Sequence, residues 1–233
     1  MSGRAVVPVP LDEAQPAFLG AQEVARRLVR ALGEGPADPD RPAALHPSTS
    51  PRAEGLEPAP GERAERRAAV LVPVVLGERP SVLLTLRAAT LSSHAGQVAF
   101  PGGGIEAGET PEAAAVREAA EEVGLDPRLP EIVGRLPEHR TGTGFHVTPV
   151  VALLHPPLVL TPDPGEVAEA FELDLAVLLD PAQPQRRARL VRGLEREFWV
   201  WPHPRHLIWG ATAAMLRNLA LVLRDSPETG TPS

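Results

Sequence analysis

The clearest chemistry in this sequence lies in three glutamates that a short helix would bring together. Glu118, Glu121 and Glu122 stand at positions i, i+3 and i+4, which on a helix share one face with Cβ atoms about 5–6 Å apart. Three like charges destabilise a bare helix, and the macrodipole disfavours anions toward its C-terminus. A hard divalent cation such as Mg²⁺ or Mn²⁺ would offset the repulsion and still accept water and phosphate. A solvated acidic face explains the carboxylates equally well.

The flanking residues predict that the helix runs from Pro111 to Val123. Thr110 is a good N-cap and Pro111 a favourable first helical residue. The alanines inside the segment favour helix, and Gly124 suits a left-handed C-cap. The glutamates would therefore lie in the second half of one helix.

A glycine run and a possible ion pair precede and accompany this helix. The run Pro101–Gly104 lets the backbone turn tightly and approach a ligand, so that a carbonyl could join a metal shell; a simple turn is the alternative. Glu109 and Arg117 could pair and tie the loop to the helix. Alternatively, they form a surface pair of little energetic value.

The composition excludes several classes of protein and of site. The chain has 233 residues, 43% of them hydrophobic, and a net charge of −7, which supports a packed core and argues against a general nucleic-acid binder. It contains no cysteine, which excludes disulfides, thiolate catalysis and cysteine zinc sites. We find no apolar run long enough for a transmembrane helix and no secretory signal, so we expect a cytoplasmic protein without a membrane partner.

The remaining pattern predicts an α/β domain with extensions. We expect a helical lead segment over 1–35 with its helix at 11–32, a Pro/Gly/Ala-rich linker over 36–67, the α/β domain over 68–225 and a disordered tail over 226–233. Strands are predicted at 68–76 and 81–87 as a hairpin, and at 97–100, 131–136, 145–154 and 195–201. Further helices are predicted near 166–179 and over 207–224.

The spacing around the helix resembles the Nudix box. Gly103 is followed after five residues by Glu109, and after seven more by the run Arg117 to Leu125, "REAAEEVGL". All fixed glycine, glutamate and arginine positions match, and only Ala119 stands where a larger aliphatic residue is usual. A match of this length in a loop–helix context is specific.

The resemblance implies an α/β/α sandwich with a mixed β-sheet, and an enzyme that hydrolyses a nucleoside diphosphate linked to another group. It implies Mg²⁺ or Mn²⁺ bound chiefly by Glu118 and Glu122, with Glu121 and the Gly103 carbonyl as further ligands. Glu109 and Arg117 would form the pair that orients Glu118. Water would attack phosphorus directly, so no nucleophilic side chain is needed.

The segment before the box, "LLTLRAATLSSHAGQVAFPGG" from Leu83 to Gly103, is similar to the signature of the coenzyme A pyrophosphatase branch. It departs at Ser92, where that branch usually has an arginine. The branch pattern continues at 144–154, 163–175 and 207–219. The residues that this resemblance indicates for substrate binding are Arg87, His94, Gln97, Gly102, Gly103 and Phe145.

Each of these assignments has a plainer alternative. Arg87 could hold a phosphate or a strand-end carboxylate, and His94 or Gln97 could simply be structural hydrogen-bonders. Phe145 could line an adenine site, or it could be part of a glycine-flanked hinge. Glu166 is the first candidate for the general base or an extra ligand, with Glu169 second; ordinary acidic enrichment at a helix start is the alternative.

The function expected from these residues is hydrolysis of coenzyme A, or of an acyl-CoA, to 3′,5′-ADP and 4′-phosphopantetheine. Another nucleoside diphosphate derivative, such as ADP-ribose or a dinucleotide, is the alternative that Ser92 favours. A catalytically silent nucleotide sensor is the alternative from another class, against which the intact Glu118, Glu121 and Glu122 argue. We expect a monomer or a homodimer.

Overall fold

The computed structural model of the protein describes residues 19–33, 66–91, 94–141, 144–191 and 194–224, without the side chains of 189–197. Its helices are α1 (Ala21–Leu32), α2 (Pro111–Val123), α3 (Leu175–Leu179) and α4 (Gly210–Arg224). Its strands are β1 (Arg66–Val75), β2 (Ser81–Arg87), β3 (Val98–Ala99), β4 (Gly102–Gly104), β5 (Glu131–Arg135), β6 (His139–Arg140), β7 (Phe145–Leu154), β8 (Val167–Asp174), β9 (Gln185–Val191), β10 (Leu194–Trp201) and β11 (Ile208–Trp209).

The main sheet is mixed and has β1 at its centre. Strand β1 pairs in parallel with β7 along its whole length, and antiparallel with β2 and β4. Strand β8 pairs with β2, and β5 and β6 pair with β7, all antiparallel. Because β1 is covered on both faces, it reads as a continuous apolar run rather than as an alternating one.

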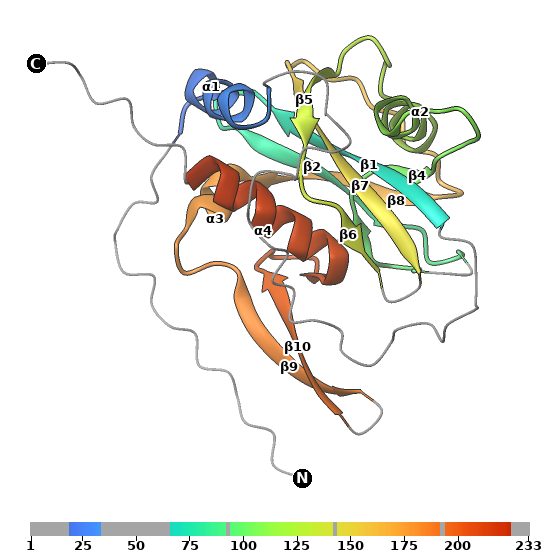
Figure 1. The fold of residues 1–233 in the computed structure, drawn as a ribbon, viewed down its shortest axis with the longest axis vertical. Coiled ribbons are helices and arrows are strands. Elements are labelled where there is room, and N and C mark those ends of the chain that lie inside the picture. The colour runs from blue at the N-terminus through green and yellow to red at the C-terminus, as the bar shows by residue number, and fades with distance from the viewer. Residues whose placement is uncertain (1–18, 34–65, 92–93, 142–143, 192–193, 225–233) are drawn as a thin grey trace, which may run out of the picture.

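Helices cover both faces of this sheet (Figure 1), which gives the α/β/α layers that the resemblance to the Nudix box implies. On one face, α2 packs its alanines against β1 and β7 around Ala69, Leu71 and Val150. On the other face, α1, α3 and α4 enclose a larger core that contains Leu28 and the fully buried Trp201. The indole Nε1 of Trp201 donates a 3.0 Å hydrogen bond to the Ala213 carbonyl, so its polar atom is satisfied.

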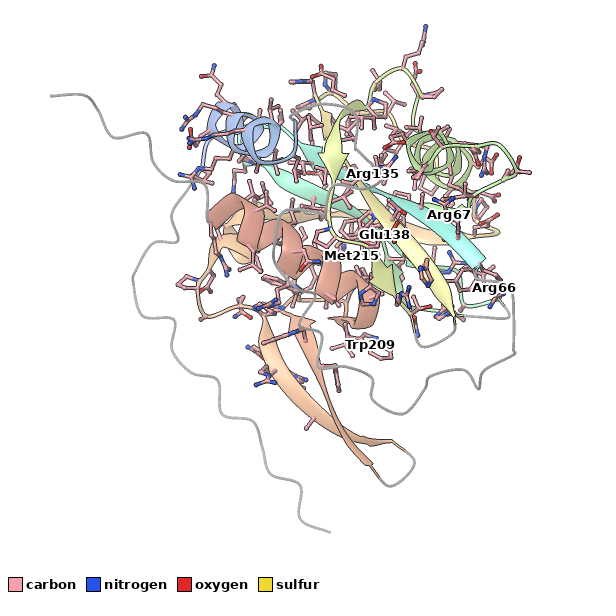
Figure 2. The ribbon with its side chains drawn as sticks, in the orientation of Figure 1. Arg66, Arg67, Arg135, Glu138, Trp209 and Met215 are labelled. Carbon is pink, nitrogen blue, oxygen red and sulfur yellow. The ribbon has the colours of Figure 1, made fainter. Side chains whose placement is uncertain are left out.

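The first turn of α2 is held at the edge of the sheet that β5 forms. Arg135 of β5 (Figure 2) pairs with Glu112 of α2, with Nε 2.6 Å from Oε1. This hydrogen bond lowers the pKa of Glu112 below its usual value. Helix α2 therefore crosses the sheet in a defined direction that carries its second half toward β2 and β4.

The lead helix belongs to the same core as the C-terminal helix. Val24 and Leu28 of α1 have no exposed surface, and Arg27 donates a 2.8 Å hydrogen bond to the Leu223 carbonyl at the end of α4. The helix begins at Ala21, after Gly20, whereas we predicted a start at residue 11; residues 11–18 lie outside the described residues. The predicted linker and tail also fall largely or wholly outside them.

One predicted helix is wrong in its first part. We predicted helix near 166–179, but Val167–Asp174 is strand β8 and only Leu175–Leu179 is helical. The alanines and glutamates of this segment favour helix locally, yet pairing with β2 and burial of Phe171 and Leu173 prevail.

Three smaller elements also differ from prediction. The glycine run was expected to turn, and instead it adds strand β4 to the sheet. Helix α4 starts at Gly210 rather than 207, because Ile208 and Trp209 pair with β10. Strand β9 was not predicted, and it forms with β10 a hairpin that extends away from the main sheet (Figure 1). Among the described helices, none is both long and apolar enough to cross a membrane.

Candidate metal centre

Helix α2 has the capping that its sequence predicts. The Thr110 hydroxyl accepts a 3.2 Å hydrogen bond from the Ala113 amide, and Gly124 ends the helix in the left-handed region at φ 66°. The bounds match the prediction, Pro111 to Val123. With this phase the second half of α2 presents Glu118 and Glu122 to the sheet, whereas Glu121 is 61% exposed.

Two glycines of β4 allow close packing on different sides, Gly102 against β1 and Gly103 against α2. A Cβ on Gly102 would stand 2.5 Å from the Val70 Cα, and a Cβ on Gly103 would stand 2.5 Å from the Glu118 carboxylate carbon. Gly102 has no room for a side chain, and a side chain at Gly103 would displace the Glu118 carboxylate. The carboxylate of Glu118 therefore rests directly on the glycine backbone.

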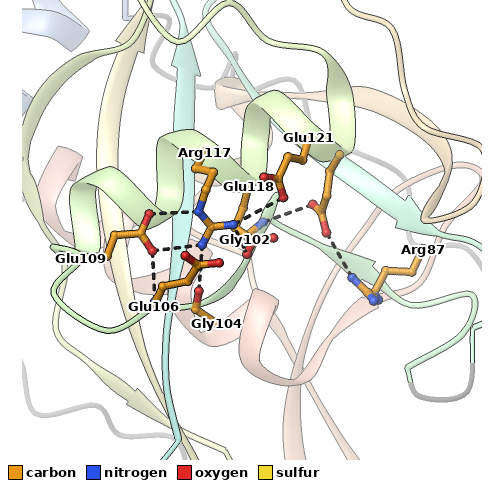
Figure 3. A network of polar contacts seen from close by, with 9 residues as sticks. Arg87, Gly102, Gly104, Glu106, Glu109, Arg117, Glu118 and Glu121 are labelled. Carbon is orange, nitrogen blue, oxygen red and sulfur yellow. Dashed lines mark hydrogen bonds and ion pairs between the residues drawn. The ribbon is translucent and has the colours of Figure 1, made fainter.

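Arg117 joins the loop, the strand and the helix in one network (Figure 3). Its Nε and Nη2 each lie 3.0 Å from a carboxylate oxygen of Glu109, and Nη2 also donates to the Gly104 carbonyl at 3.0 Å. Its Nη1 lies 2.8 Å from Glu118 Oε1 and 3.4 Å from Glu121 Oε2. These hydrogen bonds lower the pKa of Glu109 and raise that of Arg117. The network holds Glu118 in one orientation.

Glu122 is the buried member of the group, with a side chain only 3% exposed. Its Oε2 accepts a 3.1 Å hydrogen bond from the Gly102 amide, and its Oε1 lies 3.4 Å from Arg87 Nη1. Burial raises its pKa to about 7, and the negative charges of Glu166 and Glu118 add to the rise. The Gly102 amide and Arg87 act in the opposite direction but do not compensate.

Glu166 comes to this group from a separate part of the chain. It ends the turn that begins at Asp163, whose amide donates to the Glu122 carbonyl at 2.9 Å. The Glu166 carbonyl accepts a 2.8 Å hydrogen bond from Ala88, the residue after β2. Glu166 is exposed, and its charge acts on the pKa of Glu122. The fold thus gathers carboxylates from α2 and from the start of β8.

The structure puts the other predicted residues in three different places. Arg87 faces Glu122, whereas His94 and Gln97 contact each other, with His94 Nδ1 3.0 Å from Gln97 Oε1, in the exposed turn that returns to Arg87. Phe145 packs on the face covered by α4, and the Arg66 guanidinium lies 3.9 Å from its ring centre. Glu169 also lies on the α4 side, so neither joins the carboxylates.

Sequence reasoning missed how the backbone supports the site. It treated Gly102 only as a substrate contact, whereas the Gly102 amide donates to Glu122. It also did not predict that the Gly104 carbonyl would accept from Arg117, or that the Asp163 amide would bind the end of α2. The three consecutive glycines were the available signal, because such a run also permits close approach of a helix to a strand.

The donor set fits a hard divalent cation. In the described ranges, no three side chains of His, Cys, Asp or Glu already converge as a metal-binding group. Arg117 holds Glu118, and Arg87 lies beside Glu122. Carboxylate oxygens are nevertheless the ligands that Mg²⁺ and Mn²⁺ prefer. The buried Glu122 lies near Glu118 and Glu166, whose negative charges help to raise its pKa, and a cation would offset this repulsion.

The family model and the sequence relatives agree on one family. The model of the NUDIX domain family matches residues 65–194. The chain is 43% identical over 164 residues to a Cronobacter sakazakii protein named "Uncharacterized Nudix hydrolase NudL", covering 70% of this chain and 85% of that protein. It is 41% identical over 175 residues to the Klebsiella pneumoniae protein of the same name, covering 74% and 91%. The solved Nudix hydrolase RenU from M. smegmatis is 32% identical over 48% of this chain and 73% of that one, with a TM-score of 0.41.

Proposed function

Since the chain belongs to the Nudix family, we propose that it is a metal-dependent pyrophosphatase that hydrolyses the diphosphate of coenzyme A or of an acyl-CoA. That it is a Nudix hydrolase of the pyrophosphatase type follows from the family match and from its relatives. Coenzyme A as the substrate, the metal as Mg²⁺ or Mn²⁺, and the individual site residues are the parts that we propose.

One observation carries the choice of substrate. The segment Leu83–Gly103 resembles the coenzyme A pyrophosphatase signature and lies beside the carboxylates, and hydrogen bonds join Arg87 to the residues that follow the turn. The Arg87 amide donates to the Gln97 carbonyl at 3.0 Å, and the Gly96 amide donates to the Arg87 carbonyl at 3.1 Å. The segment ends at Gly102 and Gly103, against Glu122 and Glu118. A substrate bound at the metal would therefore lie beside this segment, which supports a role for it in recognition.

Glu118 and Glu122 would hold the cation, with Glu166, Glu121 and the Gly103 carbonyl as further donors. When bound, the cation supplies charge neutralisation at phosphorus and an activated water. Carboxylates need to be ionised to serve as ligands. For Glu122 this means losing the proton that its buried position favours.

The chain's own groups have distinct tasks in the reaction. Among the described residues, the Arg87 guanidinium contacts Glu122 at 3.4 Å while its buried Nε has no hydrogen-bond partner, so Arg87 retains donors for a phosphate oxygen. Arg117 and Glu109 keep Glu118 oriented, and Glu166 is the candidate for the base that takes a proton from water. Water forms the new P–O bond and the bridging P–O bond breaks. The products are 3′,5′-ADP and 4′-phosphopantetheine.

Chromatography of the products tests the proposal. Purified protein is incubated with coenzyme A, ADP-ribose or NADH, each with Mg²⁺ or Mn²⁺. Release of 3′,5′-ADP from coenzyme A, well above the other rates, is the expected result. Cleavage of only the other substrates would overturn the substrate choice and direct attention to Ser92, which lies outside the described residues. Tight nucleotide binding without turnover would favour a nucleotide sensor.

A further inference from the structure

A cluster of charged and aromatic side chains lies on β8, outside the carboxylate site. Glu169 Oε1 lies 2.5 Å from Arg205 Nη2, and Glu169 Oε2 lies 3.2 Å from His206 Nε2, the latter without hydrogen-bond geometry. The rings of His203 and His206 stack 4.9 Å apart, and Phe171 packs against both, at 4.8 and 4.6 Å. The cluster joins β8 to the segment between β10 and β11.

This cluster is next to an irregularity in the sheet. Leu86 of β2 faces Glu169, but Arg87 faces Val167, so Ala168 is an extra residue on β8. In a regular strand, Val167 and Phe171 would point to the same face. Instead, Val167 lies in the core under α2, and Phe171 lies in the core on the α4 side. The bulge therefore redirects the start of β8 toward α2.

Glu166 immediately precedes this redirected residue. Its carboxylate makes no hydrogen bond to any residue in the described part of the chain, so its direction depends on the backbone on either side. On one side, the Glu166 carbonyl is held by the Ala88 amide at 2.8 Å. On the other side stands the bulge, whose first residue beyond Ala168 is Glu169.

We infer that Glu169 is a positioning residue, whose contacts with Arg205 and His206 hold the bulge at Ala168 and thereby aim Glu166 at the carboxylate site. The inference rests on the proposed metal-dependent hydrolysis, in which Glu166 acts. It assigns Glu169 a role different from that of a second candidate base, since its carboxylate is held on the opposite face of the sheet from α2.

The first test separates positioning from binding and folding. Glu169→Gln keeps the shape of the side chain but removes its charge. Arg205→Met removes the cation that pairs with Glu169, at a position where the arginine side chain is 62% exposed. Each should lower kcat about 10–100-fold, as loss of an outer contact to a metal site does, with little change in KM or thermal midpoint. Glu172→Gln on the same strand, whose partner is the Ser81 hydroxyl, should leave kcat unchanged. If Glu169→Gln fails to fold, Arg205→Met carries the test.

The second test asks whether the effect passes through Glu166. In a Glu166→Gln background, Glu169→Gln should cause no further loss, because interacting sites are not additive. The same comparison is made for the affinity of the protein for Mn²⁺ alone, measured by electron paramagnetic resonance. Glu169→Gln should weaken Mn²⁺ binding only when Glu166 is present. An equal loss in both backgrounds would show a general structural role and overturn the inference. Absence of all hydrolysis in the wild type would refute the proposed function, while the Mn²⁺ titration would still decide the inference.

Discussion

Replacing Glu122 by glutamine should make the metal-free protein more stable at alkaline pH, although it removes a proposed metal ligand. Burial, with the charges of Glu166 and Glu118, raises the pKa of Glu122 from 4.5 to about 7 in the folded chain. Between these two values the folded state binds more protons than the unfolded state. The stability that the protonated carboxyl contributes is therefore complete below the lower value and is lost as pH rises through the upper one.

The magnitude follows from the same shift. Linkage gives a cost to folding of about 3 kcal/mol at about pH 8 and of about 1 kcal/mol at about pH 5. Because Glu122 is only 3% exposed, solvent screening reduces this little. Glutamine does not titrate and can still accept from the Gly102 amide. The stability of Glu122→Gln relative to wild type should therefore rise by about 2 kcal/mol between those two pH values.

Urea denaturation in the presence of a chelator, followed by circular dichroism, measures this difference at each pH. The matched control is Glu121→Gln, which removes a carboxylate from the same helix at a site 61% exposed and should change stability by no more than about 0.5 kcal/mol. The reasoning would be refuted if the free energy of unfolding of Glu122→Gln changed with pH in parallel with that of the wild type, from acid to alkaline pH. Addition of Mn²⁺ should then stabilise the wild type more than the variant, because only the wild type keeps the buried ligand.

Three further predictions concern the site and the core. Gly103→Ala should lower kcat about tenfold or more with a smaller effect on stability, because the new Cβ would displace the flexible Glu118 carboxylate, whose carbon lies 2.5 Å away. The control is Gly104→Ala, where a Cβ would meet nothing within 4 Å. Both variants are compared in the same activity and melting assays. Leu28→Ala should cost about 2–5 kcal/mol in a denaturation curve, since Leu28 has no exposed surface and the lead helix is part of the core; a cost near zero would show that α1 is dispensable. Arg87→Lys should raise KM about tenfold for diphosphate substrates in steady-state kinetics, because lysine cannot form a two-donor contact with phosphate; an unchanged KM would remove Arg87 from substrate binding.

Local signals predicted the part of the fold that carries the box. Thr110, Pro111 and Gly124 specify the ends of α2 through capping, and their preferences act within a few residues. The strands on either side of Gly77 and Pro80 were likewise predictable from their apolar runs and the turn between them. The approach of Arg117 to Glu109 also follows from short separation in sequence, eight residues.

Signals of longer range were misread. The segment after Glu166 has helix-forming alanines, but β2 offers it a row of hydrogen-bonding partners that no local preference reveals. The same pairing contains the bulge at Ala168, which puts Val167 and Phe171 on opposite faces of the sheet although they are four residues apart. In the sequence, Glu166 and Glu169 are three residues apart and have similar standing, and only the tertiary structure shows that Glu166 lies near Glu122 whereas Glu169 pairs with Arg205.

By itself, then, the sequence determined the family, the helix that bears Glu118 and Glu122, and the chemistry that such carboxylates support, since each depends on residue types at short spacing. Tertiary structure alone decided which carboxylates meet. Glu122 becomes buried where α2 packs against β4 and accepts a hydrogen bond from the Gly102 amide, and Glu166 comes near it from the turn before β8, more than forty positions away. Burial and charge proximity depend on packing between distant segments, and these two together raise the pKa of Glu122. A divalent cation would offset the repulsion among these carboxylates.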